Sequence, residues 1–123
     1  MKNKSYIKGF LEDIVLHLIS ENNEMYGYEI TKKVQELTNG VITVTEGALY
    51  PILHKLENEN KLTAQFKNAS GRMRKYYKLT PEGGKTVTTG STELADFFAG
   101  MQQIFHLKPA AKWAHQNNLA SKN

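Results

Sequence analysis

The sequence has no cysteine among its 123 residues, which excludes disulfide bridges, cysteine-ligated zinc and thiol nucleophiles. It has no apolar run of the roughly 18 residues that a membrane-spanning helix needs. The chain starts basic and then apolar, but Glu12, Asp13 and His17 interrupt the apolar run and no small-residue cleavage site follows, which argues against a signal peptide. We therefore expect a cytoplasmic location.

Catalytic and metal-binding patterns are also missing. The histidines at positions 17, 54, 106 and 115 do not have metal-ligand spacing. No glycine-rich phosphate loop follows a predicted strand, and no nucleophile elbow occurs. The sequence therefore predicts a protein that is not an enzyme and that holds no metal or cofactor.

The positive charge is concentrated in one segment. The formal net charge is only +4, but a single acid, Glu82, lies between Lys61 and Lys85. The basic residues of this segment are Lys61, Lys67, Arg72, Arg74, Lys75, Lys78 and Lys85. Such a block is typical of a phosphate-binding surface, although charge alone is equally compatible with a solvated hairpin.

The first half of the chain has helical periodicity. Apolar residues three and four apart predict an amphipathic helix over residues 5–22 and a second helix from about Tyr26 to Leu37, where Tyr26, Ile30, Val34 and Leu37 point inward. The β-branched run Val41–Val44 favours a short strand. A third helix, capped by Thr45, runs to about Glu59 with Leu49, Ile52, Leu53 and Leu56 inward.

Proline at position 51 lies inside this third helix. A proline there removes a backbone donor and clashes with the carbonyl group four residues back, at a cost of about 3 kcal/mol. That carbonyl belongs to Gly47, which has no side chain, so we expect the backbone to shift there. A kink and a tight first turn both remain open.

The second half of the chain predicts a hairpin and a long helix. Residues 62–67 and 74–79 alternate in polarity around the turn-forming residues 68–71. Thr80 and Pro81 then suit the cap and the first position of a helix that ends before Pro109. Its apolar seam is heptad-like, and its many threonines are poor helix formers, so it needs a partner surface.

The order of these elements predicts a mainly α (α+β) fold, a winged helix-turn-helix with a long C-terminal dimerisation helix. We expect a winged helix DNA-binding domain at 1–80, a dimerisation helix at 81–108 and a polar tail at 109–123. The tail contains Trp113, and we expect one further short helical piece around it.

Three motifs in this order resemble the PadR family of bacterial transcriptional regulators. They are YGYEI (26–30), GALYP (47–51) with Leu53 to Glu57, and GRMRKYYKLT (71–80) followed by Glu82 and Gly83. The resemblance covers about residues 5–107 and is to the smaller members, which carry one C-terminal helix. It implies a homodimer that represses genes by binding a palindromic operator on duplex DNA and releases it when a small molecule binds.

The third helix and the hairpin carry the candidate DNA-binding residues. Recognition helices present their N-terminal residues to base edges, and a basic wing contacts phosphate or the minor groove. The candidates are Thr45, Gly47, Tyr50, Pro51, His54, Lys55, Lys67, Ser70, Gly71, Arg72, Arg74 and Lys75. For Tyr50 the alternative is a partly buried core aromatic, and for His54 a solvent-facing residue. We interpret Glu46 as serving the helix dipole, and Tyr76 and Tyr77 as packing residues.

The apolar stripe of the last helix carries the candidate dimer interface. Together with the first helix it comprises Ile7, Phe10, Leu11, Ile14, Leu94, Phe97, Phe98, Met101, Ile104 and Phe105. Aromatic and methionine side chains suit planar ligands, so a planar or aromatic effector is expected at Phe10, Ile14, Leu94, Phe97, Phe98 and Met101. The small PadR members imply the same, although this helix has no tryptophan.

A protein-interaction module is the alternative function, because the winged-helix fold also serves without DNA. That alternative predicts a neutral or acidic wing, whereas this wing is basic.

Overall fold

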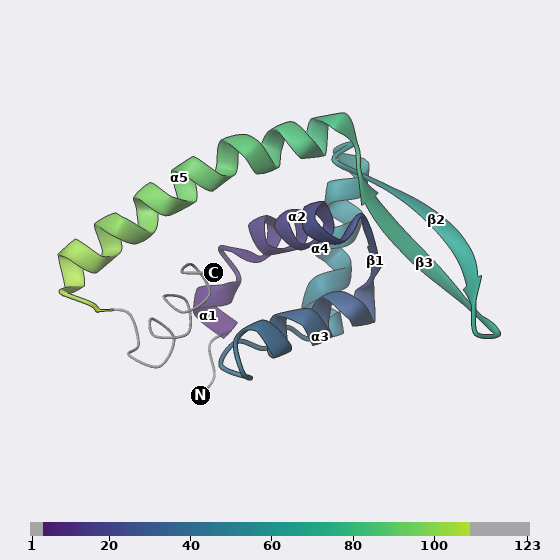
Figure 1. Ribbon diagram of the computed structural model, residues 1–123, viewed down its shortest axis with the longest axis horizontal. Coiled ribbons are helices and arrows are strands. Elements are labelled where there is room, and N and C mark those ends of the chain that lie inside the picture. The colour runs from purple at the N-terminus through teal and green to yellow at the C-terminus, as the bar shows by residue number, and fades with distance from the viewer. Residues whose placement is uncertain (1–3, 109–123) are drawn as a thin grey trace, which may run out of the picture. The chain divides into compact units, whose positions relative to one another are not determined.

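The computed structural model describes residues 4–108, and Figure 1 shows its elements. These are α1 (Lys4–Ile7), α2 (Leu11–Asn22), β1 (Glu24–Tyr26), α3 (Gly27–Leu37), α4 (Glu46–Asn58), β2 (Leu62–Ala69), β3 (Arg72–Leu79) and α5 (Pro81–Phe105). They fall into two compact units that divide between Gly90 and Ser91, within α5. The predicted tail at 109–123, with Trp113, lies outside the described residues. Among residues 4–108 no helix is long and apolar enough to cross a membrane.

The core of the first unit lies between α2, α3, α4 and the inner part of the sheet (Figure 1). Its side chains come from all of these elements, as the helical periodicity of the sequence predicts. Those with the lowest exposure are Val15, Ile19, Ile30, Leu49, Leu53, Leu56, Leu62 and Tyr77. The predicted mainly α winged-helix fold is confirmed, with α4 as its third long helix and the β2–β3 hairpin as its wing.

The single helix predicted over residues 5–22 is divided in two. After α1 the chain makes a turn in which the Phe10 N–H donates to the Ile7 carbonyl at 2.9 Å, and α2 begins at Leu11. Gly9 lies in this turn, and glycine disfavours a helix interior by about 1 kcal/mol relative to alanine. The prediction of one continuous helix was therefore wrong at this point.

The third strand is not where the β-branched residues predicted it. Val41–Val44 forms no strand. Its backbone is held by the Thr38 hydroxyl, which accepts from the Ile42 N–H at 3.0 Å, and Val44 is buried in the core. Residues Glu24–Tyr26, expected as the end of a loop and the first residue of a helix, instead form β1. Tyr26 is therefore a strand residue that precedes α3.

The sheet is antiparallel, with strand order β1-β3-β2. In the wing, β2 and β3 pair from Leu62 opposite Leu79 out to Ala69 opposite Arg72. Ser70 and Gly71 connect them with φ values of 54° and 80°. Two left-handed residues are what a two-residue type I′ hairpin turn requires. The predicted hairpin is confirmed, with longer strands and a shorter turn than expected.

The chain packs tightly where β3 passes into α5. The Thr80 hydroxyl caps α5 by accepting from the Gly83 N–H at 3.0 Å, as predicted, and the Thr80 N–H donates to the Lys61 carbonyl at 3.1 Å. A Cβ added at Gly83 would lie 2.1 Å from the carbonyl oxygen of Lys61. Because that obstacle is backbone, any side chain at position 83 has to push the start of α5 away from Lys61, the residue before β2.

We predict that Gly83→Ala destabilises the fold and that Gly84→Ala does not. Overpacking of this kind costs about 1–3 kcal/mol. A Cβ at Gly84 meets nothing within 4 Å, so alanine there gains the helix preference of about 0.5–1 kcal/mol. Urea unfolding followed by circular dichroism measures both variants. Equal stability of the two would contradict the close contact at Gly83.

Candidate nucleic-acid interface

Helix α4 begins as the sequence predicts. The Thr45 hydroxyl accepts from the Ala48 N–H at 3.2 Å, and Glu46 lies in the first turn, where a negative charge is favourable. One face of α4 is buried through Leu49, Leu53 and Leu56. The candidates on the other face, among them Gly47, Pro51 and His54, are exposed.

Pro51 lies within a continuous α4. The helix runs from Glu46 to Asn58 through this residue. Pro51 has no N–H to donate to the Gly47 carbonyl four residues back, so the first turn of α4 has one backbone hydrogen bond fewer than a regular helix. Gly47 is exposed and its carbonyl lies in the N-terminal turn of α4, the part of a recognition helix that approaches base edges.

Tyr50 lies against Gly27 at the start of α3. A Cβ added at Gly27 would lie 2.9 Å from the Tyr50 hydroxyl oxygen and 3.1 Å from its ring carbons. Tyr50 nevertheless stays 43% exposed. Its ring packs against Gly27, as a core aromatic would, and part of it remains accessible to a ligand such as DNA. Partial burial and then the charge of Glu46 raise the pKa of the Tyr50 phenol above its ordinary value. The hydroxyl is therefore a hydrogen-bond donor at neutral pH.

Lys55 is paired with another helix. Its ammonium group forms an ion pair with Glu12 of α2, and the carboxylate of Glu59, the residue after the end of α4, lies 3.9 Å away. The hydrogen bond to Glu12 and its charge raise the pKa of Lys55. Both side chains are substantially exposed, and such pairs contribute little to stability. A phosphate can therefore replace Glu12 at small cost.

The candidate residues of the wing lie on two different faces. Residues paired across a sheet point to the same side, and Lys67 pairs with Arg74 and Ala69 with Arg72. Lys67, Arg72 and Arg74 thus share one face, which we term the outer sheet face. Lys75 pairs with Phe66 and lies on the opposite side. Ser70 and Gly71 form the exposed tip, where the Gly71 N–H donates to the Asn68 side chain at 3.1 Å.

Two tyrosines organise the outer sheet face. The rings of Tyr26 and Tyr76 meet edge to face at 5.3 Å. The Arg74 guanidinium lies 4.4 Å from the Tyr26 ring centroid, and the Lys67 ammonium lies 5.0 Å from that of Tyr76 and forms an ion pair with Glu24. Sequence reasoning missed the roles of Tyr26 and Glu24. Alternation along β3 placed Arg74 and Tyr76 on one face, but the pairing with β1 gave no sequence signal.

Lys75 connects the wing to α4. Its ammonium donates to Glu57 of α4 at 3.2 Å and lies 5.4 Å from the Tyr77 ring centroid. Burial lowers the pKa of Lys75, but the contacts with Glu57 and Tyr77 outweigh this effect and raise it overall. On the same side, Phe66 and Met73 are 63% and 65% exposed. This side of the wing is therefore more apolar than the outer sheet face.

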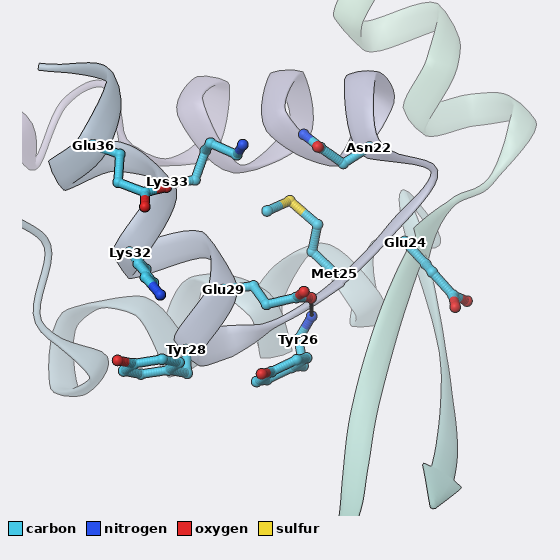
Figure 2. Close-up of a pocket in the computed structure, with 9 residues that line it drawn as sticks. All are labelled: Asn22, Glu24, Met25, Tyr26, Tyr28, Glu29, Lys32, Lys33 and Glu36. Carbon is cyan, nitrogen blue, oxygen red and sulfur yellow. Dashed lines mark hydrogen bonds between the residues drawn. The ribbon is translucent and has the colours of Figure 1, made fainter. Parts of the chain in front are cut away.

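A groove of about 350 Å³ lies beside the outer sheet face (Figure 2). It is formed by the end of α2, by β1 and by α3, and most of its lining is polar, including Glu29, Lys32 and Lys33. Figure 2 shows the Glu29 carboxylate accepting from the Tyr26 N–H, a hydrogen bond of 3.1 Å. Glu29 thus fixes the backbone of Tyr26 where β1 passes into α3.

The candidate dimer and effector residues differ in exposure. Leu11 is buried in the core, Ile7 and Ile14 are partly buried against it, and Phe10 is half-buried. In the second unit, Leu94 and Met101 are half-buried. The other candidates on α5 are between 48% and 69% exposed: Phe97, Phe98, Ile104 and Phe105. The C-terminal half of α5 thus carries large exposed apolar side chains, whereas Leu11 is enclosed by its own unit.

Comparison with known proteins finds relatives in sequence and in structure. The chain is 32% identical over 108 residues to a protein from Lysinibacillus sphaericus, covering 87% of this chain and 94% of that one. It is 36% identical over 75 residues to a transcriptional regulator from Mycobacterium tuberculosis. That match covers 59% of this chain and 67% of the regulator. A transcriptional regulator from Clostridium thermocellum matches in structure with a TM-score of 0.73 and 26% identity, covering 84% and 97%.

The family model of PadR-like transcriptional regulators matches residues 15–89. This range contains the part of α2 from residue 15 onward, together with β1, α3, α4, both strands of the wing and the start of α5. It therefore contains all of the candidate DNA-binding residues. The chain belongs to the PadR-like family of transcriptional regulators, which are regulators of transcription and not enzymes.

Proposed function

We propose that the chain is a cytoplasmic repressor that binds a palindromic operator as a homodimer and releases it when a small molecule binds. The observation that carries this proposal is the outer sheet face, where Arg72 and Arg74 lie close to the wing tip without a carboxylate partner among residues 4–108. Uncompensated cations on an exposed hairpin next to a recognition helix suit a phosphate backbone.

The candidate residues divide between two tasks. The exposed first turns of α4, with Gly47, Tyr50, Pro51 and His54, suit base edges, because a recognition helix reads the groove with its N-terminal part. The wing, with Arg72, Arg74, Lys67 and the tip, suits phosphate and sugar, as Lys55 does. Contacts to phosphate set affinity and register, whereas contacts to bases set the sequence that is read.

We predict that Arg74→Ala weakens binding to operator and to unrelated duplex DNA by similar factors. Each lost phosphate contact should also reduce the slope of log K against log salt by about 0.9. His54→Ala should instead reduce the ratio of operator affinity to nonspecific affinity, because a base contact is worth about 1–3 kcal/mol. Fluorescence anisotropy over a salt titration measures both quantities.

The matched control is Lys85→Ala, which removes the same charge from α5, outside the proposed interface. It should leave the salt slope almost unchanged. If Arg74→Ala and His54→Ala reduce discrimination equally, the division of tasks is wrong. Weak binding that is flat in salt for every duplex would instead favour the protein-interaction module.

The proposed dimer interface lies on the C-terminal half of α5. It carries several large aromatic and aliphatic side chains that are about half exposed or more. An exposed apolar patch of this kind is typical of a protein–protein contact surface. A second copy of the same helix offers a matching apolar surface, and twofold symmetry makes such an interface self-complementary. We propose residues 81–108 as the dimerisation helix on this ground.

We predict that Phe98→Asp dissociates the dimer, because a carboxylate buried in an apolar seam lacks a partner. Gln103→Asp is the control, since position 103 lies about 140° around the helix from Phe98 at 100° per residue. Sedimentation velocity should show monomer for the first variant and dimer for the second. A stable Phe98→Asp dimer would remove Phe98 from the interface.

We propose that the effector is a planar aromatic molecule held by the aromatic and methionine side chains of α5, with Phe97, Phe98 and Met101 as contacts. Linkage requires that a ligand which lowers operator affinity by a given factor binds the operator complex more weakly by that same factor. Titration of planar aromatic compounds into free and operator-bound protein tests this reciprocity. Equal affinity for both forms would exclude a compound as the effector.

A further inference from the structure

One cation of the outer sheet face is directed away from the wing tip. The backbone of Lys67 lies opposite Arg74, whereas that of Glu24 lies opposite Lys78, four residues further from the tip along β3. Four residues of a strand span roughly 13 Å. To form its ion pair with Glu24, the Lys67 side chain therefore runs back along the sheet.

The path of Lys67 is fixed by the ring beneath it. Its ammonium lies 5.0 Å from the Tyr76 ring centroid, and the Tyr26 ring packs against the edge of Tyr76. The Lys67 side chain is 40% exposed and that of Glu24 is 24% exposed. This pair is thus less accessible to water than Lys55 and Glu12, which are 51% and 36% exposed, and it is screened less by salt.

Arg74 and Lys67 differ in the group that lies beside their charge. Its guanidinium lies over the Tyr26 ring at 4.4 Å, and an aromatic face attracts a cation without cancelling its charge. Glu24, in contrast, cancels the charge of Lys67. In the free protein the outer sheet face near the tip therefore presents Arg72 and Arg74 as uncompensated cations. The charge of Lys67 is neutralised by Glu24.

We propose that Glu24 competes with DNA phosphate for Lys67 and thereby limits the number of phosphates that the wing neutralises. Glu24 is a positioning residue that acts through Lys67. The inference rests on the proposed function, because it requires that the outer sheet face meets DNA.

The test is the salt dependence of binding by Glu24→Gln, an isosteric change that removes the charge. The released Lys67 adds one phosphate contact per subunit, so the slope of log K against log salt becomes steeper by about 0.9 per subunit. Per subunit, the ratio of variant to wild-type affinity then grows about eightfold for each tenfold dilution of salt. The binding partner is a duplex of unrelated sequence, where electrostatic contacts dominate.

Two controls separate Lys67 from net charge. Glu21→Gln removes an equal charge from an exposed site on α2, where Glu21 lies 3.3 Å from His17, and it should leave the slope unchanged. Lys67→Met combined with Glu24→Gln should restore the slope of Lys67→Met alone. An equal steepening by Glu21→Gln, or steepening that persists without Lys67, would overturn the proposal. Circular dichroism melting of each variant establishes that the fold is kept.

Failure of this inference is distinguishable from failure of the proposed function. If Arg72→Ala and Arg74→Ala reduce the slope while Glu24→Gln leaves it unchanged, the wing binds DNA and the role of Glu24 is wrong. If none of the three variants changes the slope, the outer sheet face does not meet DNA and both proposals fall.

Discussion

The pairing of β3 with strands on both of its edges is the constraint on which the rest of the structure depends. β1 immediately precedes α3 and β2 follows α4 closely, so the two helices and the wing are fixed to one strand. Tyr77 lies opposite both Met25 and Ala64 and is almost fully buried. Because backbone hydrogen bonds to both neighbours and this buried ring act together, the wing cannot turn relative to the helices without opening the core.

The parts of the fold that sequence reasoning predicted are those with local signals. The cap at Thr45 and the spacing of Leu49, Leu53 and Leu56 defined α4, and alternation with turn residues defined the wing. β1 was missed because three residues are too few to show a period, and its partner is about 50 positions away. Val41–Val44 was assigned as a strand because β-branched residues favour one, whereas burial of Val44 decided otherwise.

The candidate site shows the same division. Alternation along the second strand of the hairpin placed Arg74 and Lys75 on opposite faces, as the pairing of β3 with β2 shows. The partners of the cations do not follow, because Lys67 and Glu24, like Lys55 and Glu12, lie 43 positions apart. A count of basic residues therefore overstates the charge that the wing presents. The contact of Tyr50 with Gly27 could not be predicted from the sequence either. It depends on the absence of a side chain at Gly27, in the YGYEI motif, which leaves room for the ring of Tyr50, in the GALYP motif.

Pro51 has a consequence for how this regulator can diverge. The buried face of α4 is fixed by leucines, while the first turn is held by the Thr45 cap and by the seat of Tyr50 on Gly27, and it lacks one backbone bond. The leucines run along one face of α4, from Leu49 in the first turn to Leu56, so the core holds that face and not the exposed one. Under the proposed function, substitutions at exposed positions such as His54 alter which operator is read at little cost in folding stability. A duplicated copy of the gene could acquire a new operator through few changes.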